Sequence, residues 1–491
     1  MSLHTTGTRA RLARRAAVPG GPLADLRPRK RRVFAASCIA AVLSLGLAQG
    51  GPRATTNKTA LDRYVFAPDP SYRYEIVRTN KAQGFTELVV DMVSQEWRTA
   101  AEVDRPQWRH WLTIVIPDQL RSTTAFLLID GGSNGREAPR GGDLILGAVA
   151  ARSQTVMAHL RMVPNEPLTF KDENRSRTED EIIAYTWDKF LRTGDETWPL
   201  RLPMTKSAVR AMDTVTAVCA AQGKTGVEKF FVAGASKRGW TTWTTAAVDD
   251  RVVAIAPIVI DVLNGEKSIE HHYRAYGFWA PAVQDYVDMH IMDWAGTAPF
   301  RNLMRIEDPY SYRDRLTMPK LIVNATGDQY FPLDSSQFYF DGLKGEKHLR
   351  YVPNAKHNLA NSDALATIQA FYESVIQGVP RPRYTWKFEG DSSIVATAAD
   401  KPVEVRLWQA TNPKARDFRL DTLGPAFKST PLEADSSGRY SARVAAPPEG
   451  WTAFFVELTF PGPGGTPLKL TSGVRILPDK LPGGPPPKNR P

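Results

Sequence analysis

The sequence predicts an α/β fold built on a mainly parallel sheet, followed by a small all-β region. Three observations carry this prediction. Between about residues 85 and 377, short apolar runs alternate with helix-like segments, the pattern of strands joined by helices that cover both faces of a sheet. One run leads into Gly234-Ala235-Ser236-Lys237-Arg238-Gly239, which indicates a strand, a sharp turn and a helix. Beyond residue 383 the pattern changes to short strands separated by turns.

The composition allows two domains or more and concentrates the basic charge at the N-terminus. The chain has 491 residues, of which 42% are hydrophobic, and a net charge of +11. Residues 1–50 hold nine Lys and Arg and one acid, so the rest of the chain has 54 basic and 51 acidic residues, a net charge of +3. We therefore expect no nucleic-acid partner.

Residues 1–50 have the layout of an export signal. A basic region ends at Arg31-Arg32, an apolar run covers residues 33–47, and small residues follow. The sequence Arg31-Arg32-Val33-Phe34 also fits a twin-arginine signal. The run is short for a membrane span. The alternative to a cleaved signal is an uncleaved N-terminal anchor, which is the one membrane contact that we expect. The predicted location is periplasmic or extracellular, and residues 51–60 form a linker.

The first strands of the sheet are predicted at residues 88–93, 111–116 and 125–129. The third leads into a glycine-rich loop, in which the backbone N–H groups of Gly132 and Ser133 are candidates for an oxyanion hole. An ordinary glycine-rich turn is the alternative. A strand at residues 155–162 and an exposed polar connection at residues 171–181 follow.

Two helices are predicted between this connection and the sharp turn. The first surrounds residues 187–191, and the second carries an apolar stripe of 3.6-residue period that includes Cys219. We interpret Cys219 as a buried core thiol rather than a nucleophile.

The turn at Ser236 predicts a nucleophile elbow. A serine at the apex of a strand–turn–helix unit exposes its hydroxyl at the carboxyl end of the strand, and the N–H of Lys237 can then stabilise an oxyanion. Arg238 stands where the common G-x-S-x-G pattern has its second glycine, and Gly239 comes one residue later. The alternative is a turn with a capping serine.

A helical cap is predicted after the next strand, which covers residues 252–260 and ends at Asp261. Residues 264–315 lie between two strands and are rich in aromatic residues, which either line an apolar pocket or pack the cap onto the sheet. The histidines of this segment, His271, His272 and His290, lack the spacing of metal ligands, so we expect no metal and no cofactor.

An acid and a histidine follow the last two strands of the sheet. Asp328 comes after the strand at residues 321–325, and His357 after the strand at residues 348–352. The order Ser236, Asp328, His357 is that of α/β-hydrolases, in which the histidine takes the serine proton and the acid orients the histidine. Asp261 is the alternative acid, and Asp334 is a weaker candidate.

The hydrolase-like part is expected to end with a helix at residues 363–377 and a boundary at residues 378–383. Short strands with intervening turns then predict a β-sandwich-like domain at residues 384–477. The proline- and glycine-rich residues 478–491 predict a disordered tail.

Several of these segments resemble the PhoPQ-activated pathogenicity-related family. They are residues 234–243, residues 258–264, Val163-Pro164-Asn165, and Thr326-Gly327-Asp328 with Phe331, within a resemblance that covers about residues 61–379. The family is similar to α/β-hydrolases, so the resemblance implies Ser236, Asp328 and His357 as a triad. The family includes exported bacterial proteins and secreted eukaryotic proteins with signalling roles, and it shares the Lys-Arg-Gly-Trp form of the elbow.

Two hypotheses about function follow. The first is a secreted serine hydrolase that acts on a small-molecule ester or on a peptide through an acyl-enzyme. The alternative is a secreted binding or signalling protein on a hydrolase scaffold, with little or no turnover, because a fold does not by itself determine a function.

Overall fold

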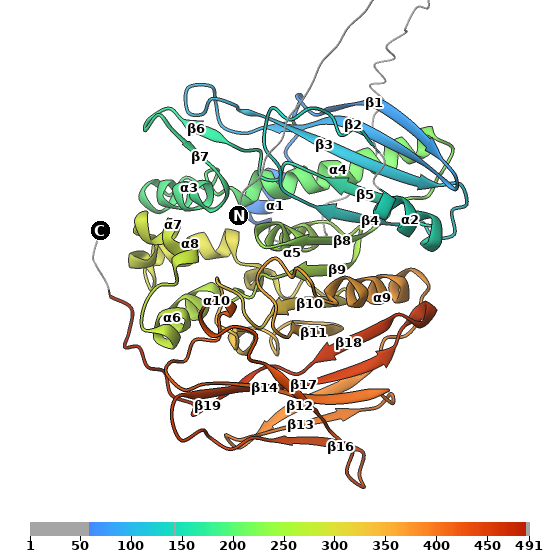
Figure 1. Cartoon of the computed structure of the whole chain (residues 1–491). Coiled ribbons are helices and arrows are strands. Elements are labelled where there is room, and N and C mark those ends of the chain that lie inside the picture. Colours follow the sequence, from blue (N-terminus) through green and yellow to red (C-terminus); the bar gives the residue numbers. More distant parts are fainter. Residues whose placement is uncertain (1–57, 142–143, 488–491) are drawn as a thin grey trace, which may run out of the picture. The chain divides into compact units, whose positions relative to one another are not determined.

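A nine-stranded sheet forms the centre of the α/β part (Figure 1). The computed structural model describes residues 58–141 and 144–487. The strands follow the order β1-β2-β3-β5-β4-β8-β9-β10-β11. Their bounds are β1 (Arg73–Ala82), β2 (Phe85–Glu96), β3 (Gln107–Pro117), β4 (Thr124–Ile129), β5 (Met157–Leu160), β8 (Lys229–Ala235), β9 (Val252–Ile258), β10 (Lys320–Ala325) and β11 (Lys347–Val352). The six strands from β5 to β11 in this order are parallel, and β1 to β3 are antiparallel, so the predicted mainly parallel sheet is confirmed.

Helices cover both faces of this sheet. One face carries α1 (Ala60–Val65), α4 (Arg201–Ala221) and α5 (Lys237–Val248), and the other carries α2 (Leu144–Ser153) and α9 (Ala364–Ile376). Alternate side chains of a strand point to opposite faces. In β8, Phe230 and Val232 therefore join the core under α4 and α5, whereas Phe231 and Ala233 join the core under α2 and α9.

The predicted thiol of α4 is buried. Cys219 has no exposed surface, and burial raises the pKa of its thiol to about 12. A thiol with such a pKa carries almost no thiolate at neutral pH, so the structure agrees with a core role for Cys219.

The predicted helical insertion lies between β9 and β10. It consists of α6 (Gly265–Tyr276), α7 (Gln284–Asp288) and α8 (Ala298–Glu307), with short 3₁₀ turns between them. In Figure 1 these helices gather with α3 (Glu179–Thr193) on the left side of the view. None of the helices in the described part of the chain is both long enough and apolar enough to cross a membrane.

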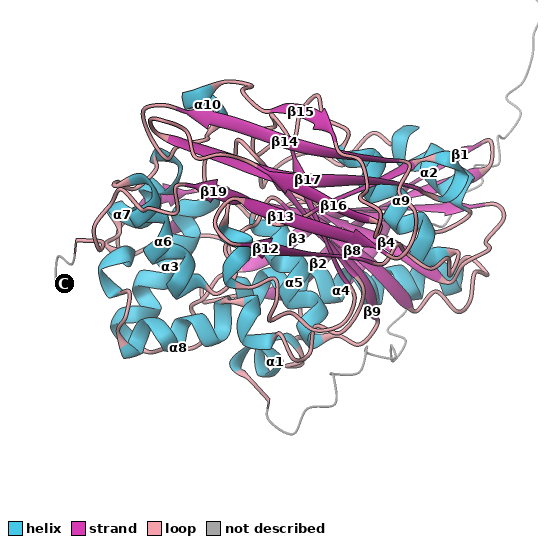
Figure 2. Ribbon diagram, turned by 90° about the horizontal axis from the view of Figure 1, so that it is seen from below, coloured by secondary structure: helices cyan, strands magenta, loops and turns pink. Residues whose placement is uncertain are grey.

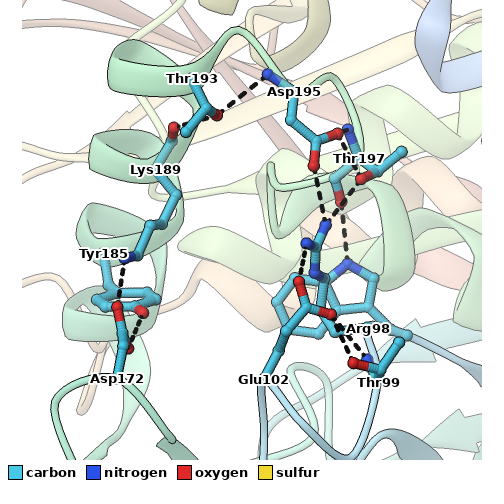
Figure 3. A network of polar contacts seen from close by, with 10 residues as sticks. Arg98, Thr99, Glu102, Asp172, Tyr185, Lys189, Thr193, Asp195 and Thr197 are labelled. Atoms are coloured by element: carbon cyan, nitrogen blue, oxygen red, sulfur yellow. Dashed lines mark hydrogen bonds and ion pairs between the residues drawn. The ribbon is translucent and has the colours of Figure 1, made fainter.

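A polar network fixes α3 to the loops around it (Figure 3). Arg98, just beyond β2, donates to Thr197 Oγ1 at 2.7 Å and also pairs with Glu102. Closer to the N-terminus of α3, Tyr185 donates to Asp172 Oδ1 at 2.6 Å. These contacts tie the middle of α3 and the loop after it to neighbouring loops, which matters because the first residues of α3 reach the candidate site.

The C-terminal part forms two antiparallel sheets, as predicted (Figure 2). One sheet contains β12 (Tyr384–Glu389), β13 (Ser393–Ala398) and β16 (Arg439–Arg443). The other contains β15 (Lys428–Pro431), β14 (Glu404–Asn412), β17 (Trp451–Pro461), β18 (Pro467–Thr471) and β19 (Arg475–Leu477). The edge strand β11 lies against β18, where the N–H of Tyr351 donates to Thr471 Oγ1 at 3.0 Å.

The segment predicted as a disordered tail is described as far as Pro487. The N–H of Gly483 donates to the carbonyl of Arg274 in α6 at 2.8 Å, and Trp451 Nε1 donates to the carbonyl of Lys480 at 3.0 Å. Gly483 therefore contacts the cap, and Lys480 contacts the β region. Residues 488–491 and the predicted export signal at residues 1–50 lie outside the described residues.

Candidate active site

The carboxyl ends of β8, β10 and β11 bring three of the predicted residues to one edge of the sheet. Parallel pairing aligns the last residues of these strands, because Ala235 lies opposite Ile258 of β9 and Ala325 lies opposite Val352. Ser236 follows β8 directly, and Asp328 and His357 follow β10 and β11 within a few residues. Ligands of parallel sheets bind at this edge.

Ser236 occupies a strained turn between β8 and α5. Its φ of 57° and ψ of −129° lie in a region that side-chain-bearing residues rarely adopt, which is typical of a nucleophile elbow. The turn is tight because a Cβ on Gly234 would lie 2.6 Å from the carbonyl oxygen of Arg238. A Cβ on Gly239 would lie 2.8 Å from the carbonyl oxygen of Gly234, so a glycine is needed at position 239 for the helix to approach the strand. Position 238 does not have this constraint and carries an arginine.

The histidine and the first-choice acid are joined. His357 Nδ1 lies 2.8 Å from Asp328 Oδ2, and both side chains are largely buried. The other carboxylate oxygen of Asp328 accepts from the N–H of Tyr330 at 2.8 Å. His357 Nε2 is buried and has no hydrogen-bond partner among the described residues, so it is not hydrogen-bonded to Ser236. The ring of Tyr330 packs on the imidazole, with 4.5 Å between the ring centroids.

The two alternative acids have other partners. Asp261 accepts from the hydroxyls of Tyr339 and Tyr351, at 2.5 and 2.6 Å. Asp334 lies 2.8 Å from Nε2 of His271 on α6 and also pairs with Arg416 of the β region. The geometry therefore favours Asp328 as the partner of His357, and it assigns Asp334 to a contact that joins the cap to the C-terminal part.

The predicted oxyanion-hole residues follow two neighbouring strands, because Ile129 of β4 pairs with Gly234 of β8. Trp240 makes the first α-helical hydrogen bond of α5, to the carbonyl of Ser236 at 2.9 Å, so the N–H of Lys237 has no partner within the helix. The loop of Gly132 and Ser133 is pinned nearby, because Ser133 forms a β-bridge with Glu166. A Cβ on Gly131 of the same loop would lie 2.6 Å from the Arg238 guanidinium.

The acidic partners of Lys237 and Arg238 beside Ser236 were not anticipated from the sequence. Lys237 Nζ lies 2.6 Å from Glu179 and 3.1 Å from Asp180, and Arg238 holds Glu179 with two hydrogen bonds of 2.8 and 2.9 Å. Burial opposes ionisation of Glu179, but the contacts with Arg238 and the charge of Lys237 hold its pKa well below its ordinary value. The two cations next to the serine are thus neutralised within the protein.

The prediction of an exposed connection at residues 171–181 was therefore partly wrong. Residues Arg175–Arg177 form the short strand β7, and the Arg177 side chain is buried. Helix α3 begins at Glu179, which turns this acid and Asp180 toward the elbow. The signal was in the sequence, because Thr178 and Glu181 form a capping box that marks a helix start.

A largely apolar cavity lies beside Ser236. Its walls come from α3, α5, the cap and the loop after β10, and its aromatic lining consists of Trp187, Trp240, Trp279, Tyr286, Tyr330 and Phe331. Some aromatic residues of the cap line this cavity and others pack in the core, so each of the two predicted roles applies to part of them. Trp279 and Tyr286 line the cavity, whereas Phe300 is fully buried in the core.

We expect Asp261 to make stability depend on pH. Burial raises its pKa to about 7, despite the two tyrosine hydroxyls that donate to it. Because the unfolded chain releases this proton near pH ~4 and the folded protein keeps it until about pH 7, the contribution of Asp261 to stability falls by ~2–4 kcal/mol over that range.

The test compares urea unfolding of the wild type and Asp261→Asn between pH 4.5 and 7.5. Asparagine does not titrate, so the free energy of unfolding of the wild type should decrease relative to that of the variant as the pH rises. Histidines that titrate in the same range affect both proteins equally. A difference between the two proteins that stays constant with pH would show that Asp261 is ionised throughout.

Comparison with known proteins gives a relative in sequence and several similar solved structures. Autocrine proliferation repressor protein A of Dictyostelium discoideum is 37% identical over 458 residues, which cover 87% of this chain and 92% of that protein. Among solved structures, an acetyl xylan esterase from Paenibacillus sp. R4 has 13% identity and a TM-score of 0.45, covering 66% of this chain and 96% of that chain. A glucuronoyl esterase from Solibacter usitatus has 13% identity and a TM-score of 0.39, covering 65% and 91%.

The family model described as PhoPQ-activated pathogenicity-related protein matches residues 61–419. The match extends beyond residue 379, where the hydrolase-like part was predicted to end, and it includes Arg416, which pairs with Asp334. The match and the fold agree with the motifs at Ser236 and Asp328, and the chain belongs to the PhoPQ-activated pathogenicity-related protein family.

Proposed function

We propose that the chain is an exported serine hydrolase that cleaves an ester or amide bond through an acyl-enzyme. The observation that carries this proposal is the 2.8 Å contact between His357 Nδ1 and Asp328 Oδ2, at the same sheet edge as Ser236. A histidine oriented by an acid at the carboxyl ends of adjacent strands is the arrangement that activates a serine in α/β-hydrolases. The basic and apolar layout of residues 1–50 supports export to the periplasm or the extracellular space.

In this mechanism Ser236 Oγ attacks the carbonyl carbon while its proton passes to His357 Nε2. Asp328 keeps the other proton on Nδ1 and stabilises the imidazolium. The N–H groups of Lys237 and of Gly132 or Ser133 stabilise the oxyanion. The tetrahedral intermediate collapses when the bond to the leaving group breaks and His357 returns the proton to that group. Water then attacks the acyl-enzyme with His357 as the base, which frees the acid and restores Ser236.

The second candidate is an exported binding or signalling protein with little turnover. The name of the Dictyostelium relative, a proliferation repressor, favours it. So does the absence of a hydrogen bond on His357 Nε2 among the described residues, although catalytic contacts in ligand-free enzymes often tighten only with substrate. The two candidates differ in whether Ser236 is an activated nucleophile.

Labelling of the purified protein with a fluorophosphonate probe should distinguish the two candidates. We expect the wild type to be labelled at Ser236, as mapped by mass spectrometry, and we expect Ser236→Ala and His357→Ala to lose the label. Ser268→Ala is a matched control, because Ser268 lines the same cavity but donates its hydroxyl to the carbonyl of Leu263 at 2.8 Å. No labelling of a folded wild type would reject the hydrolase and favour the binding protein.

A further inference from the structure

The cavity beside Ser236 presents mainly apolar surface to a substrate. Several of its lining side chains are only half-buried, so they keep surface that a ligand can contact. They are Val262, Ile269, Trp279, Val283, Met292 and Phe331. They come from the segment after β9, from the cap and from the loop after β10. Ser236 belongs to the same lining, so a substrate group that enters this cavity meets apolar side chains next to the candidate nucleophile.

The charged groups of the lining are paired within the protein. Lys237 Nζ lies 2.6 Å from Glu179 and 3.1 Å from Asp180, and Asp180 also accepts from the hydroxyl of Tyr286 at 3.0 Å. Each carboxylate oxygen of Asp261 accepts a tyrosine hydroxyl. A charge that already has a partner does little to offset the hydration that a charged substrate group loses on entering.

Several uncharged polar side chains of the lining also offer few hydrogen bonds. The hydroxyls of Ser268 and Ser335 donate to backbone carbonyls of the protein at 2.8 and 2.7 Å. The ring nitrogens of His272 and the indole nitrogen of Trp187 have almost no accessible surface, so these side chains contribute ring carbons to the wall. Burial, together with the nearby charge of Arg419, lowers the pKa of His272 to about 3, so its ring is uncharged at neutral pH.

Such a wall selects its occupant by the water that the occupant loses. Burial of apolar surface is favourable in proportion to its area, whereas burial of a hydroxyl or a charge without a partner costs free energy. A sugar ring, with a hydroxyl on most carbons, is therefore a poor occupant. The ring faces of Trp279 and Phe331 also attract cations in general, but the ammonium group of Lys237 in the same lining opposes one.

We propose that the substrate of the Ser236 site places an uncharged aryl or alkyl group without hydroxyls in this cavity. The inference rests on the proposed function, because it names the substrate class of that site. Ile269, on α6, is a specificity-determining residue in this proposal, because its half-buried side chain forms part of the wall. It takes no part in bond breaking.

The test uses p-nitrophenyl phosphonates, which inactivate an activated serine when its oxygen bonds to phosphorus and nitrophenolate leaves. Three pairs have alkyl groups of one shape on phosphorus: 3,3-dimethylbutyl and 2-(trimethylammonio)ethyl, 3-methylbutyl and 2-carboxyethyl, 2-methylpropyl and 2-hydroxypropyl. A second series carries the same groups as the alkoxy substituent. The second-order rate constant is divided by that of hydroxide hydrolysis. In at least one series we expect the wild type to favour the apolar member, by ~100-fold over a charged partner and ~10-fold over the hydroxyl partner.

Ile269→Lys tests the wall itself. An ammonium group in the cavity should reduce the preference for 3-methylbutyl over 2-carboxyethyl by ~10-fold. Ile145→Lys is the matched control, because Ile145 lies on α2 and is 70% exposed, and it should leave the preference unchanged. An equal loss of rate for both members of the pair would overturn the assignment of Ile269. The wild-type rates decide the substrate class without any variant, so a variant that fails to fold leaves the test intact.

Failure of this inference is distinguishable from failure of the proposed function. If the wild type is inactivated at Ser236 but favours the apolar member in neither series, the substrate inference fails and the hydrolase stands. If no phosphonate inactivates a folded wild type, the proposed function fails. Thermal-shift titration with 3,3-dimethylbutan-1-ol and with choline, which has the same shape and a positive charge, then decides the inference by binding alone. Equal shifts, or a larger shift with choline, would overturn it.

Discussion

Replacing Asp328 by asparagine should lower the rate of fluorophosphonate labelling at Ser236 by ~10⁴-fold, the loss that follows when the orienting acid of a serine triad becomes an amide. The two oxygens of Asp328 have different partners, since Oδ1 accepts from the N–H of Tyr330 and Oδ2 faces His357 Nδ1. In the variant, the amide oxygen would stay with the N–H of Tyr330. The amide nitrogen would then donate to Nδ1, which places the imidazole proton on Nε2.

A proton on Nε2 prevents His357 from taking the proton of Ser236. The variant should therefore fold normally and fail in the chemical step. The measurement is the second-order rate constant of labelling, which needs no knowledge of the substrate. Thermal unfolding should show that stability changes little, because one hydrogen bond replaces another.

Asp261→Asn is the matched control for this experiment. Asp261 also follows a strand of the sheet and lies in the cavity of Ser236, but its oxygens are engaged by Tyr339 and Tyr351. We expect its labelling rate to stay within ~10-fold of the wild type, because it does not contact the histidine. The reverse result, with Asp261→Asn inactive and Asp328→Asn labelled normally, would make Asp261 the orienting acid.

The choice between these acids shows where sequence reasoning reaches its limit. Strand ends can be predicted from local patterns, because an apolar run and the turn that follows it are contiguous in the chain. This was enough to anticipate Ser236, Asp328 and His357 at one edge of a parallel sheet. Asp261 satisfied the same criterion, and only the tyrosine hydroxyls of Tyr339 and Tyr351, distant in sequence, distinguish it.

Contacts between distant segments account for the other omissions. Glu179 and Arg238 are far apart in the sequence, and nothing local to either one indicates their pairing. The same is true of Gly483, in the proline- and glycine-rich segment predicted as a disordered tail, whose N–H donates to the carbonyl of Arg274 in the cap. Composition predicts whether a segment can build its own core, but it does not predict whether the segment packs on a core built by others.

Glu307→Gln should destabilise the protein by ~3–5 kcal/mol, because it leaves a buried arginine without its counter-charge. Glu307 ends helix α8 of the cap and lies 3.2 Å from Arg201 Nε, and neither side chain has exposed surface. Arg201 also donates to the carbonyl of Lys237 at 2.8 Å and to Thr241 Oγ1 at 2.9 Å, both in the elbow helix. The pair therefore links the cap to the helix that begins at the candidate nucleophile.

The free energy of unfolding from urea titration measures this effect, and Glu196→Gln supplies the matched control. Glu196 pairs with Arg63 at the surface, where the two side chains are 55% and 54% exposed, so its loss should cost less than ~1 kcal/mol. Because Arg201 contacts the first residue of α5, Glu307→Gln should also slow the labelling of Ser236, whereas Glu196→Gln should not. Equal and small losses in the two variants would mean that apolar packing, rather than this ion pair, holds the cap on the elbow.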